Sequence, residues 1–392
     1  MYRSNKAILF RYKVIMRYFF EKKSSFILVL FLCLVIFTFC TNAKEIVKIG
    51  CIAPLTGANA DVGIGLKNCV ELAINQANAS GEYNYEIRLA VEDDAADPAT
   101  GVAAALKLCS DPEVIGIVSH FNSTVALATV HTTNRFGVIQ IMPGTIHPDI
   151  TRGNDYKNVF RVNPDNLTEQ YFGQALVVDK LGTVKWVSLH STDSYGEGCN
   201  DNFKQVLKEK GGTLLSEDGY TKGTRDFRPI LNRVKELEPE GIYFGDVSPE
   251  PGLCKRQMSE LGMSDVIFYG CTGMVSETFN EIAGDAAEGT YGVGYLPLDE
   301  DSAFVKAYNA TYNEPWEVTG TYAYDATGII LKALKEVGKD RNDIVEYVAS
   351  PTFQYDGILG TTRFDEYGQT MSGGLDMKIS HNGEWVSLAS LE

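Results

Sequence analysis

The stretch VIGIVSHFNSTVALATVHTTNRFGVIQIMPGT, residues 114–145, joins two apolar runs through a segment with helical spacing. The runs VIGIVS and VIQIM are short, rich in β-branched residues and uncharged, which is typical of strands buried on both faces of a sheet. A helix of this length between two such strands favours a right-handed crossover between parallel strands. The stretch therefore predicts one βαβ unit of a parallel sheet.

The same alternation of strand and helix continues on both sides of this unit. It begins at Ile46 and starts a second series after NVFRVNPDN (158–166). Other strand-like runs of the two series are IVKIGCIAPL (46–55), YEIRLAVEDD (85–94), VKWVSLHSTD (184–193), GIYFGDV (241–247) and VIFYGCT (266–272). A chain of 392 residues is long enough for two domains. The fold class that we predict is α/β, with two doubly wound parallel-sheet lobes.

No low-complexity linker separates the two series, so we expect the chain itself to cross between lobes at several points. The candidate crossings are 163–166 and 289–296. From these crossings we expect residues 44–165 with 291–365 to form lobe 1 and residues 166–290 with 366–392 to form lobe 2. A hinge of several crossings would join the two lobes. The closing segment LDMKISHNGEWVSLA (375–389) predicts a hairpin.

Residues 1–43 differ in composition from the rest of the chain. They combine a basic start, the apolar run FILVLFLCLVIFTF (26–39) and small residues at Thr41 and Ala43. This order predicts a secretory signal peptide cut near Ala43, and hence a periplasmic or other extracytoplasmic protein. An uncleaved anchor is the alternative, although a spanning helix needs about 20 apolar residues. Cys40 offers a third possibility, a lipid-anchored mature protein.

The formal net charge of −16 limits the classes of partner. Loss of the basic leader makes the exported part more acidic still, which argues against nucleic acid and anionic lipid as partners. Six cysteines follow residue 43, at positions 51, 69, 109, 199, 254 and 271. They lack the close pairs of a zinc site, and they leave open both disulfides and buried free thiols.

Candidate binding residues lie in the loops that follow the strands, because ligands of open α/β sheets bind beyond the carboxyl ends of the strands. In SHFNST (119–124) two hydroxyls follow Asn122, whereas a helix cap needs one. A helix N-terminus with a free serine hydroxyl binds small anions, so we weigh Ser123 equally as a cap and as an anion contact. Gly144 and Thr145 form a second such loop, where glycine permits close approach to the main chain.

Enzymatic interpretations find little support in the sequence. There is no P-loop, nucleophile elbow or H-E-x-x-H motif. His120 lies beside Ser123, but the sequence identifies no acidic residue that would orient His120 for catalysis. The cluster EDD (92–94) is more typical of a solvated loop than of a metal site. We therefore predict a protein that is not an enzyme and that needs no cofactor and no metal.

Several motifs in the same order resemble the leucine/isoleucine/valine-binding proteins, which are periplasmic solute receptors of ABC transporters. The resemblance runs from about Ile46 to the C-terminus. Its motifs are KIGCIAPLTG (48–57), YEIRLAVEDDAADP (85–98), YGEG (195–198), TRDFRPILNRVKELEPEGIYFG (224–245), EIAGDAAEG (281–289) and GILGTTRFDEYG (357–368). It implies the type I periplasmic binding fold, a small polar ligand between the lobes, and a membrane permease as partner.

The resemblance also implies roles for individual residues. Ser123 falls where the family binds the ligand α-carboxylate, with Phe121 and Asn122 beside it on the cleft wall. Gly144 falls where a main-chain group meets the ligand, and Tyr195 matches an aromatic residue of the second lobe.

Other positions depart from the family pattern. Ile146 replaces a threonine, and Thr272 replaces the acid that pairs with the ligand ammonium. Two aromatic positions are Val62 and Val247, and the two positions of the family's first-lobe disulfide are Ala96 and Asn122.

The loss at Thr272 matters because a buried ammonium without a carboxylate is costly. Asp246 or Asp193 is the candidate replacement from another loop; otherwise the ligand is a carboxylate, an amide or a urea-like compound. The predicted ligand contacts are Phe121, Asn122, Ser123, Gly144, Thr145, Tyr195, Asp246 and Thr272.

These observations predict an extracytoplasmic receptor of an ABC importer, which binds an amino acid or a related carboxylate or amide and closes by a hinge motion. The rival from another class is a sensory module that regulates a partner protein. A fused transmembrane signalling segment would favour that rival, and nothing after residue 43 is apolar enough to form one.

Overall fold

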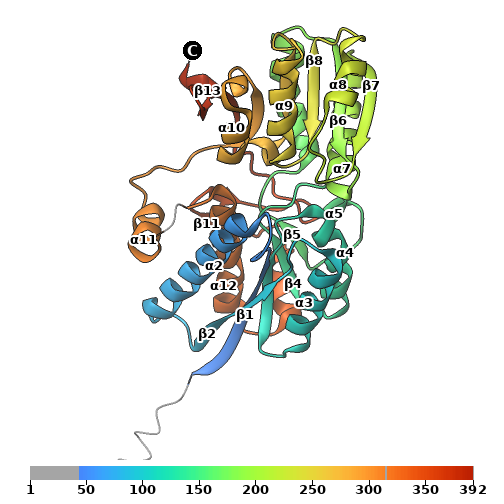
Figure 1. Ribbon diagram of the computed structural model, residues 1–392. Coiled ribbons are helices and arrows are strands. Elements are labelled where there is room, and N and C mark those ends of the chain that lie inside the picture. The colour runs from blue at the N-terminus through green and yellow to red at the C-terminus, as the bar shows by residue number, and fades with distance from the viewer. Residues whose placement is uncertain (1–43, 314–315, 392) are drawn as a thin grey trace, which may run out of the picture. The chain divides into compact units, whose positions relative to one another are not determined.

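The computed structural model describes residues 44–313 and 316–391, which form two α/β lobes, each built on its own sheet (Figure 1). The predicted leader, 1–43, lies outside the described residues. The two doubly wound lobes expected from the alternating strands and helices are confirmed.

The first lobe is built on five strands in the order β2-β1-β3-β4-β5. Their bounds are β1 (Glu45–Ala53), β2 (Tyr85–Asp93), β3 (Val114–Ser119), β4 (Ile139–Met142) and β5 (Val159–Arg161). The pairs β1–β3, β3–β4 and β4–β5 are parallel. Every residue of β3 and β4 is buried, as expected of central strands covered on both faces.

Helices cover both faces of this first sheet. They are α2 (Ala60–Ser80), α3 (Pro98–Ser110), α4 (Ser123–Arg135), α5 (Asp149–Arg152), α11 (Ala303–Thr311), α12 (Val318–Val337) and α13 (Arg341–Val348). Helices α2 and α12 lie side by side on one face and share an apolar cluster with β1 and β4 (Figure 1). Helix α3 packs on the other face against Ile52 and Ile117. A small hairpin, β11 (Tyr355–Gly357) and β12 (Gly360–Thr362), follows α13.

The second lobe is built on seven strands in the order β14-β13-β10-β9-β8-β6-β7. Their bounds are β6 (Lys185–Ser191), β7 (Thr213–Tyr220), β8 (Gly241–Gly245), β9 (Ile267–Gly270), β10 (Tyr291–Tyr295), β13 (Leu375–His381) and β14 (Glu384–Ser387). The pairs β7–β6, β6–β8, β8–β9 and β9–β10 are parallel, whereas β13 is antiparallel to both β10 and β14. The predicted C-terminal hairpin is β13–β14.

The helices of the second lobe enclose an aromatic core. They are α6 (Asn166–Gln174) with its π-helical continuation (Ala175–Lys180), α7 (Ser194–Glu209), α8 (Arg228–Lys235), α9 (Glu250–Glu260) and α10 (Glu277–Ala283). Short 3₁₀ turns span Thr272–Met274, Gly284–Ala287 and Leu388–Ser390. Phe203 stacks on Tyr243 with ring centroids 4.2 Å apart, and Trp186 meets Phe203 edge-on. Stacked and edge-on rings are the favoured arrangements of buried aromatic pairs.

The segments that connect the lobes are hydrogen-bonded to one another. The Arg161 N–H donates to the Gly368 carbonyl at 2.9 Å, and the Thr370 N–H donates to the Arg161 carbonyl at 2.9 Å. Strand β10 joins the second sheet, although the sequence grouped residues 291–295 with the first lobe. It does so because its parallel pairing with β9 extends the strand order of that sheet.

The six cysteines of the described chain are all buried free thiols. Burial raises the pKa of Cys51 to about 12 and that of Cys109 to about 11. Thiols with such pKa values are almost entirely protonated at neutral pH and therefore unreactive.

Candidate functional site

Five predicted ligand contacts lie in two neighbouring loops of the first lobe, after the parallel strands β3 and β4. They are Phe121, Asn122, Ser123, Gly144 and Thr145. The two loops touch: a methyl group added to Gly144 would lie 3.3 Å from the Phe121 ring and 2.7 Å from Thr319. The glycine therefore lets the second loop approach the first closely.

The hydroxyl of Ser123 connects these two loops. It accepts the N–H of Ile146 at 3.2 Å and the N–H of His147 at 3.3 Å. The serine is fully buried and is the first residue of α4, so it does not cap its own helix. The expectation of a cap is corrected here, because Asn122 takes the N-cap position and makes no side-chain cap bond either.

The start of α4 consequently keeps backbone N–H groups that no side-chain cap satisfies. Such groups, together with the helix dipole, favour an anion at this end of the helix. Buried oxygens of Asn122, Thr124 and Thr145 have no hydrogen-bond partner among the described residues. Buried polar atoms are nearly always paired, so three unpaired oxygens at the start of α4 and in the adjacent loop call for a polar partner from outside the described residues.

Substitution of Ser123 by alanine tests the role of this hydroxyl. The change leaves the N–H groups of Ile146 and His147 without their acceptor, and we expect the free energy of unfolding to fall by about 1–3 kcal/mol. Urea denaturation measures this loss. Thr124→Val is the matched control, because the Thr124 hydroxyl has no partner and its removal should leave stability unchanged or raised. Equal stability of the Ser123 variant and the wild type would contradict the connecting role.

The second-lobe candidates Tyr195, Asp246 and Thr272 also lie after strands of one sheet. The Tyr195 hydroxyl lies 3.2 Å from the Cys271 sulfur, and a methyl group on Gly273 would lie 2.4 Å from that hydroxyl. The backbone N–H of Ser248 donates to the carbonyl of Gly273 at 3.3 Å. Tyr195 shares an apolar cluster with Ile146, so the isoleucine that replaces the family's threonine takes part in packing.

Asp246 is fully buried, and its oxygens already have partners within the chain. It accepts the Tyr220 hydroxyl at 2.6 Å and the Val247 N–H at 2.8 Å, and Lys222 Nζ lies 3.5 Å away. Burial raises the pKa of Asp246 to about 6, although Lys222 and the hydrogen bonds oppose the rise. The role of Asp246 as a ligand contact stays a prediction. In this structure Asp246 pairs with Lys222.

Lys222 is a residue of this region that sequence reasoning missed. Its ammonium pairs with Asp193 at 2.8 Å and lies 5.9 Å from the centre of the Tyr195 ring. Asp193 in turn caps α7 by accepting the Gly196 N–H at 2.9 Å. Both acids suggested as replacements for the lost family carboxylate thus share one lysine. No motif marks Lys222, which follows an ordinary strand in TKGTR.

Glu169 is the second residue that was missed. It lies in the first turn of α6, is fully buried, and accepts the Thr272 hydroxyl at 2.7 Å. Its signal in the sequence is a mostly polar helix face: Asn166, Glu169, Gln170, Gly173 and Gln174 are the buried residues of α6, and four of the five are polar. Buried polar side chains are uncommon and need hydrogen-bond partners, so such a face calls for an explanation.

His120 belongs to a buried structural network. Its Nδ1 lies 2.7 Å from Asp94 and its Nε2 lies 2.9 Å from the Thr129 hydroxyl. Asp94 is the orienting acid that the sequence did not reveal. The Thr129 hydroxyl is fully buried and also lies 3.0 Å from the Ala126 carbonyl, so the chain of contacts ends inside the first lobe.

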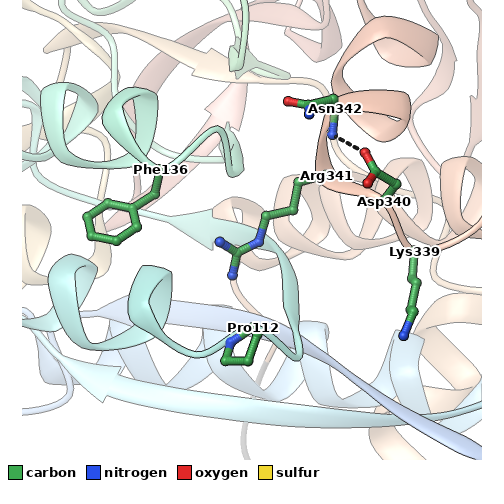
Figure 2. A pocket seen from close by; sticks show the side chains of 6 residues that line it. All are labelled: Pro112, Phe136, Lys339, Asp340, Arg341 and Asn342. Carbon is green, nitrogen blue, oxygen red and sulfur yellow. Dashed lines mark hydrogen bonds between the residues drawn. The ribbon is translucent and has the colours of Figure 1, made fainter.

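A pocket elsewhere in the first lobe is lined by Pro112, Phe136, Lys339, Asp340, Arg341 and Asn342 (Figure 2). It lies by the starts of β3 and β4, whereas the predicted contacts follow the ends of these strands. The Arg341 guanidinium donates to the carbonyls of Cys109, Asp111 and Val114 at 2.6–3.1 Å. These bonds hold α13 against the sheet, which explains the arginine without a ligand.

Two further searches cover the described residues only. In 44–313 and 316–391 no cluster of His, Cys, Asp and Glu has the arrangement of a metal site. Within the same ranges, no helix combines the length and apolarity needed to cross a bilayer.

Comparison with known proteins agrees with this geometry. The profile of the periplasmic binding protein family matches residues 46–383. The Leu/Ile/Val-binding protein homologue 2 of Brucella abortus is 32% identical over 326 residues, which cover 82% of this chain and 87% of that protein. The leucine-, isoleucine-, valine-, threonine- and alanine-binding protein of Pseudomonas aeruginosa is 29% identical over 332 residues, with coverage of 83% and 87%.

Solved structures show the same fold. The branched-chain amino acid transporter substrate binding protein LivJ of Streptococcus pneumoniae, in complex with isoleucine, has a TM-score of 0.77 at 24% identity and covers 88% of this chain and 100% of its own. A solute binding protein of an R. palustris ABC transporter, in complex with benzoate, has a TM-score of 0.75 at 21% identity, with coverage of 88% and 96%.

The fold and the two polar loops therefore define a ligand-binding receptor with two α/β lobes. The chain belongs to the periplasmic binding protein family, in the group of leucine/isoleucine/valine-binding proteins. Proteins of this family bind solutes and are not enzymes, and they act outside the cytoplasm.

Proposed function

We propose that this protein is the extracytoplasmic receptor of an ABC importer and that it binds a small carboxylate-bearing solute between its lobes. The observation that carries the proposal is the uncapped start of α4 beside the unpaired oxygens of Asn122, Thr124 and Thr145. The ligand carboxylate would accept N–H groups of α4, while Ser123 holds the second loop in place. Tyr195 and Thr272 are the proposed second-lobe contacts.

The names of relatives and neighbours support the class of ligand. Amino acids appear in the names of the Brucella and Pseudomonas relatives, and the solved complexes contain isoleucine or benzoate, both of which carry a carboxylate. The importer, the permease partner, export by the leader at 1–43 and a lipid anchor at Cys40 belong to the same proposal.

Calorimetry and mass spectrometry test the proposal together. The purified mature protein is denatured and the released small molecules are identified; it is then refolded and titrated with α-amino acids, their amides and small carboxylates. We expect a carboxylate-bearing compound to bind with a dissociation constant of about 1 μM or lower, near −8 kcal/mol. Failure of every compound to bind, with no released molecule, would overturn the receptor proposal.

A further inference from the structure

The carboxylate of Glu169 has an unusual set of partners. Its Oε1 accepts the Thr272 hydroxyl at 2.7 Å, and its Oε2 accepts the Asn166 side-chain amide at 3.0 Å. The residue is fully buried. Both partners are neutral donors that hold the two oxygens in fixed positions.

No ion pair joins Glu169 to a Lys, Arg or His of the described residues. Arg161 is nearby, but its guanidinium donates to Gln369 and to the His147 carbonyl, both at 2.6 Å, and its closest acid is Asp165 at 3.7 Å. Burial raises the pKa of Glu169 well above its usual range, whereas the bonds from Thr272 and Asn166 favour the charged form. An ionised carboxylate in such a place is costly until a cation joins it.

The surroundings of Glu169 suit a cation from outside the chain. The hydroxyls of Tyr243 and Tyr269 contact Gln170, the next residue of α6, at 3.0 and 3.5 Å, and the charge of Glu169 adds to the effect of burial in raising the pKa of both tyrosines. Tyrosine rings attract ammonium groups through their electron-rich faces. Of the predicted second-lobe contacts, Thr272 bonds to this acid directly, and Tyr195 lies 3.2 Å from the sulfur of Cys271, the residue before Thr272.

Glu169 is also joined to the loop of the first lobe that carries Thr145. The Asn166 backbone N–H donates to the Ile146 carbonyl at 2.8 Å, and the Asn163 side chain donates to the Thr145 carbonyl at 2.9 Å. The acid therefore lies between the loop of Thr145 and the turn of Thr272. Asp193 and Asp246, by contrast, already share Lys222.

We propose that Glu169 supplies the carboxylate that pairs with an ammonium group of the ligand, so that the solute is an α-amino acid rather than a simple carboxylate. This inference rests on the proposed receptor function and specifies its ligand. The ligand carboxylate meets the start of α4, and its ammonium meets Glu169 beside Thr272.

Paired ligands test the inference in the wild-type protein. An α-amino acid that binds is compared, by calorimetry, with its deaminated counterpart, which keeps the same carbon skeleton and carboxylate but lacks the ammonium. We expect the deaminated compound to bind about 100-fold more weakly or worse, since loss of one partner from a buried charge pair is severe. Equal binding of the two compounds would overturn the role of Glu169 and leave the receptor function intact. If neither these nor any other carboxylate binds, both proposals fail.

Variants assign the effect to Glu169 itself. Glu169→Gln keeps the shape of the side chain and is expected to weaken amino-acid binding about 100-fold while changing binding of the deaminated compound little. Glu209→Gln, the same change on the exposed side of α7, is the matched control and should bind like the wild type. The double variant Glu169→Gln/Thr272→Glu returns an acid to within reach of the same point, because the two side chains are 2.7 Å apart, and should regain binding. Unchanged binding by a folded Glu169→Gln protein would contradict the inference.

Discussion

Replacement of Arg161 by methionine is expected to lower the free energy of unfolding by about 3–5 kcal/mol. The guanidinium is fully buried, and burial lowers its pKa only to about 10, so it remains charged at neutral pH. Methionine fills similar space but removes the donors to Gln369, to the His147 carbonyl and to the Thr151 hydroxyl. It also leaves Asp165, which is 2% exposed, with less compensation for its charge.

Urea denaturation followed by circular dichroism measures this loss. Arg152→Met is the matched control: Arg152 also pairs with Asp165, at 3.3 Å, but its side chain is 37% exposed. Exposed ion pairs contribute about 0–1 kcal/mol, so the control should lose far less than the Arg161 variant. Similar losses of unfolding free energy in the two variants would contradict the argument that the buried hydrogen bonds of Arg161 stabilise the protein more than the exposed pairs of Arg152 do.

Replacement of Lys222 by methionine is expected to destabilise the protein by about 1 kcal/mol at pH 8, the upper end for a partly exposed ion pair, and by less at pH 5. The Lys222 side chain is 39% exposed, and solvent screens its two ion pairs, which limits the effect. The pH dependence comes from Asp246, whose folded pKa of about 6 lies above its ordinary value of 3.8. A raised acid pKa means that the folded state holds the proton more tightly, so stability falls as pH rises from about 4 through 6.

Without Lys222 this fall should extend to higher pH, because the cation that favours the ionised Asp246 is gone. Part of the loss remains at pH 5, since Lys222 is also among the groups that hold the pKa of Asp193 below its ordinary value, against the opposing effect of burial. The free energy of unfolding at pH 5 and pH 8 measures the difference. Lys204→Met, which removes pairs with two more exposed acids, should show a small effect that varies little with pH. A loss in the Lys222 variant that grows toward pH 5 would contradict the argument.

Much of the fold could be predicted because its signals are local. The fully buried runs of β3 and β4 and the helical spacing of α4 are visible within residues 114–142, and β13–β14 surrounds the turn at Asn382 and Gly383. The placement of β10 was harder, since it depends on which sheet offers β10 a partner edge. That choice is set by pairing with β9 and β13, which are distant from each other in the sequence.

A site residue could be predicted from the sequence only where its role depends on the loop in which it lies. Ser123 and Gly144 are recognisable as strand-end residues, yet the contact between their loops is not encoded in either stretch alone. Glu169 and Lys222 were missed because their meaning comes from partners far along the chain: Thr272 is 103 positions from Glu169, and Asp246 is 24 positions from Lys222. The helix-end position of Glu169 looks like an ordinary favourable charge until its burial is known.

The order of these elements along the chain also affects when each lobe can complete its fold. The first sheet is finished by β5 at Arg161, but α12, which covers one of its faces, begins only at Val318. The second sheet likewise gains β13 and β14 only from the last residues of the chain. Neither lobe is therefore a continuous piece of polypeptide: a chain that ends before Val318 lacks the helix that covers one face of the first sheet, and a chain that ends before Leu375 leaves the edge of β10 unpaired. The second sheet can therefore be completed only when the strands β13 and β14 are present.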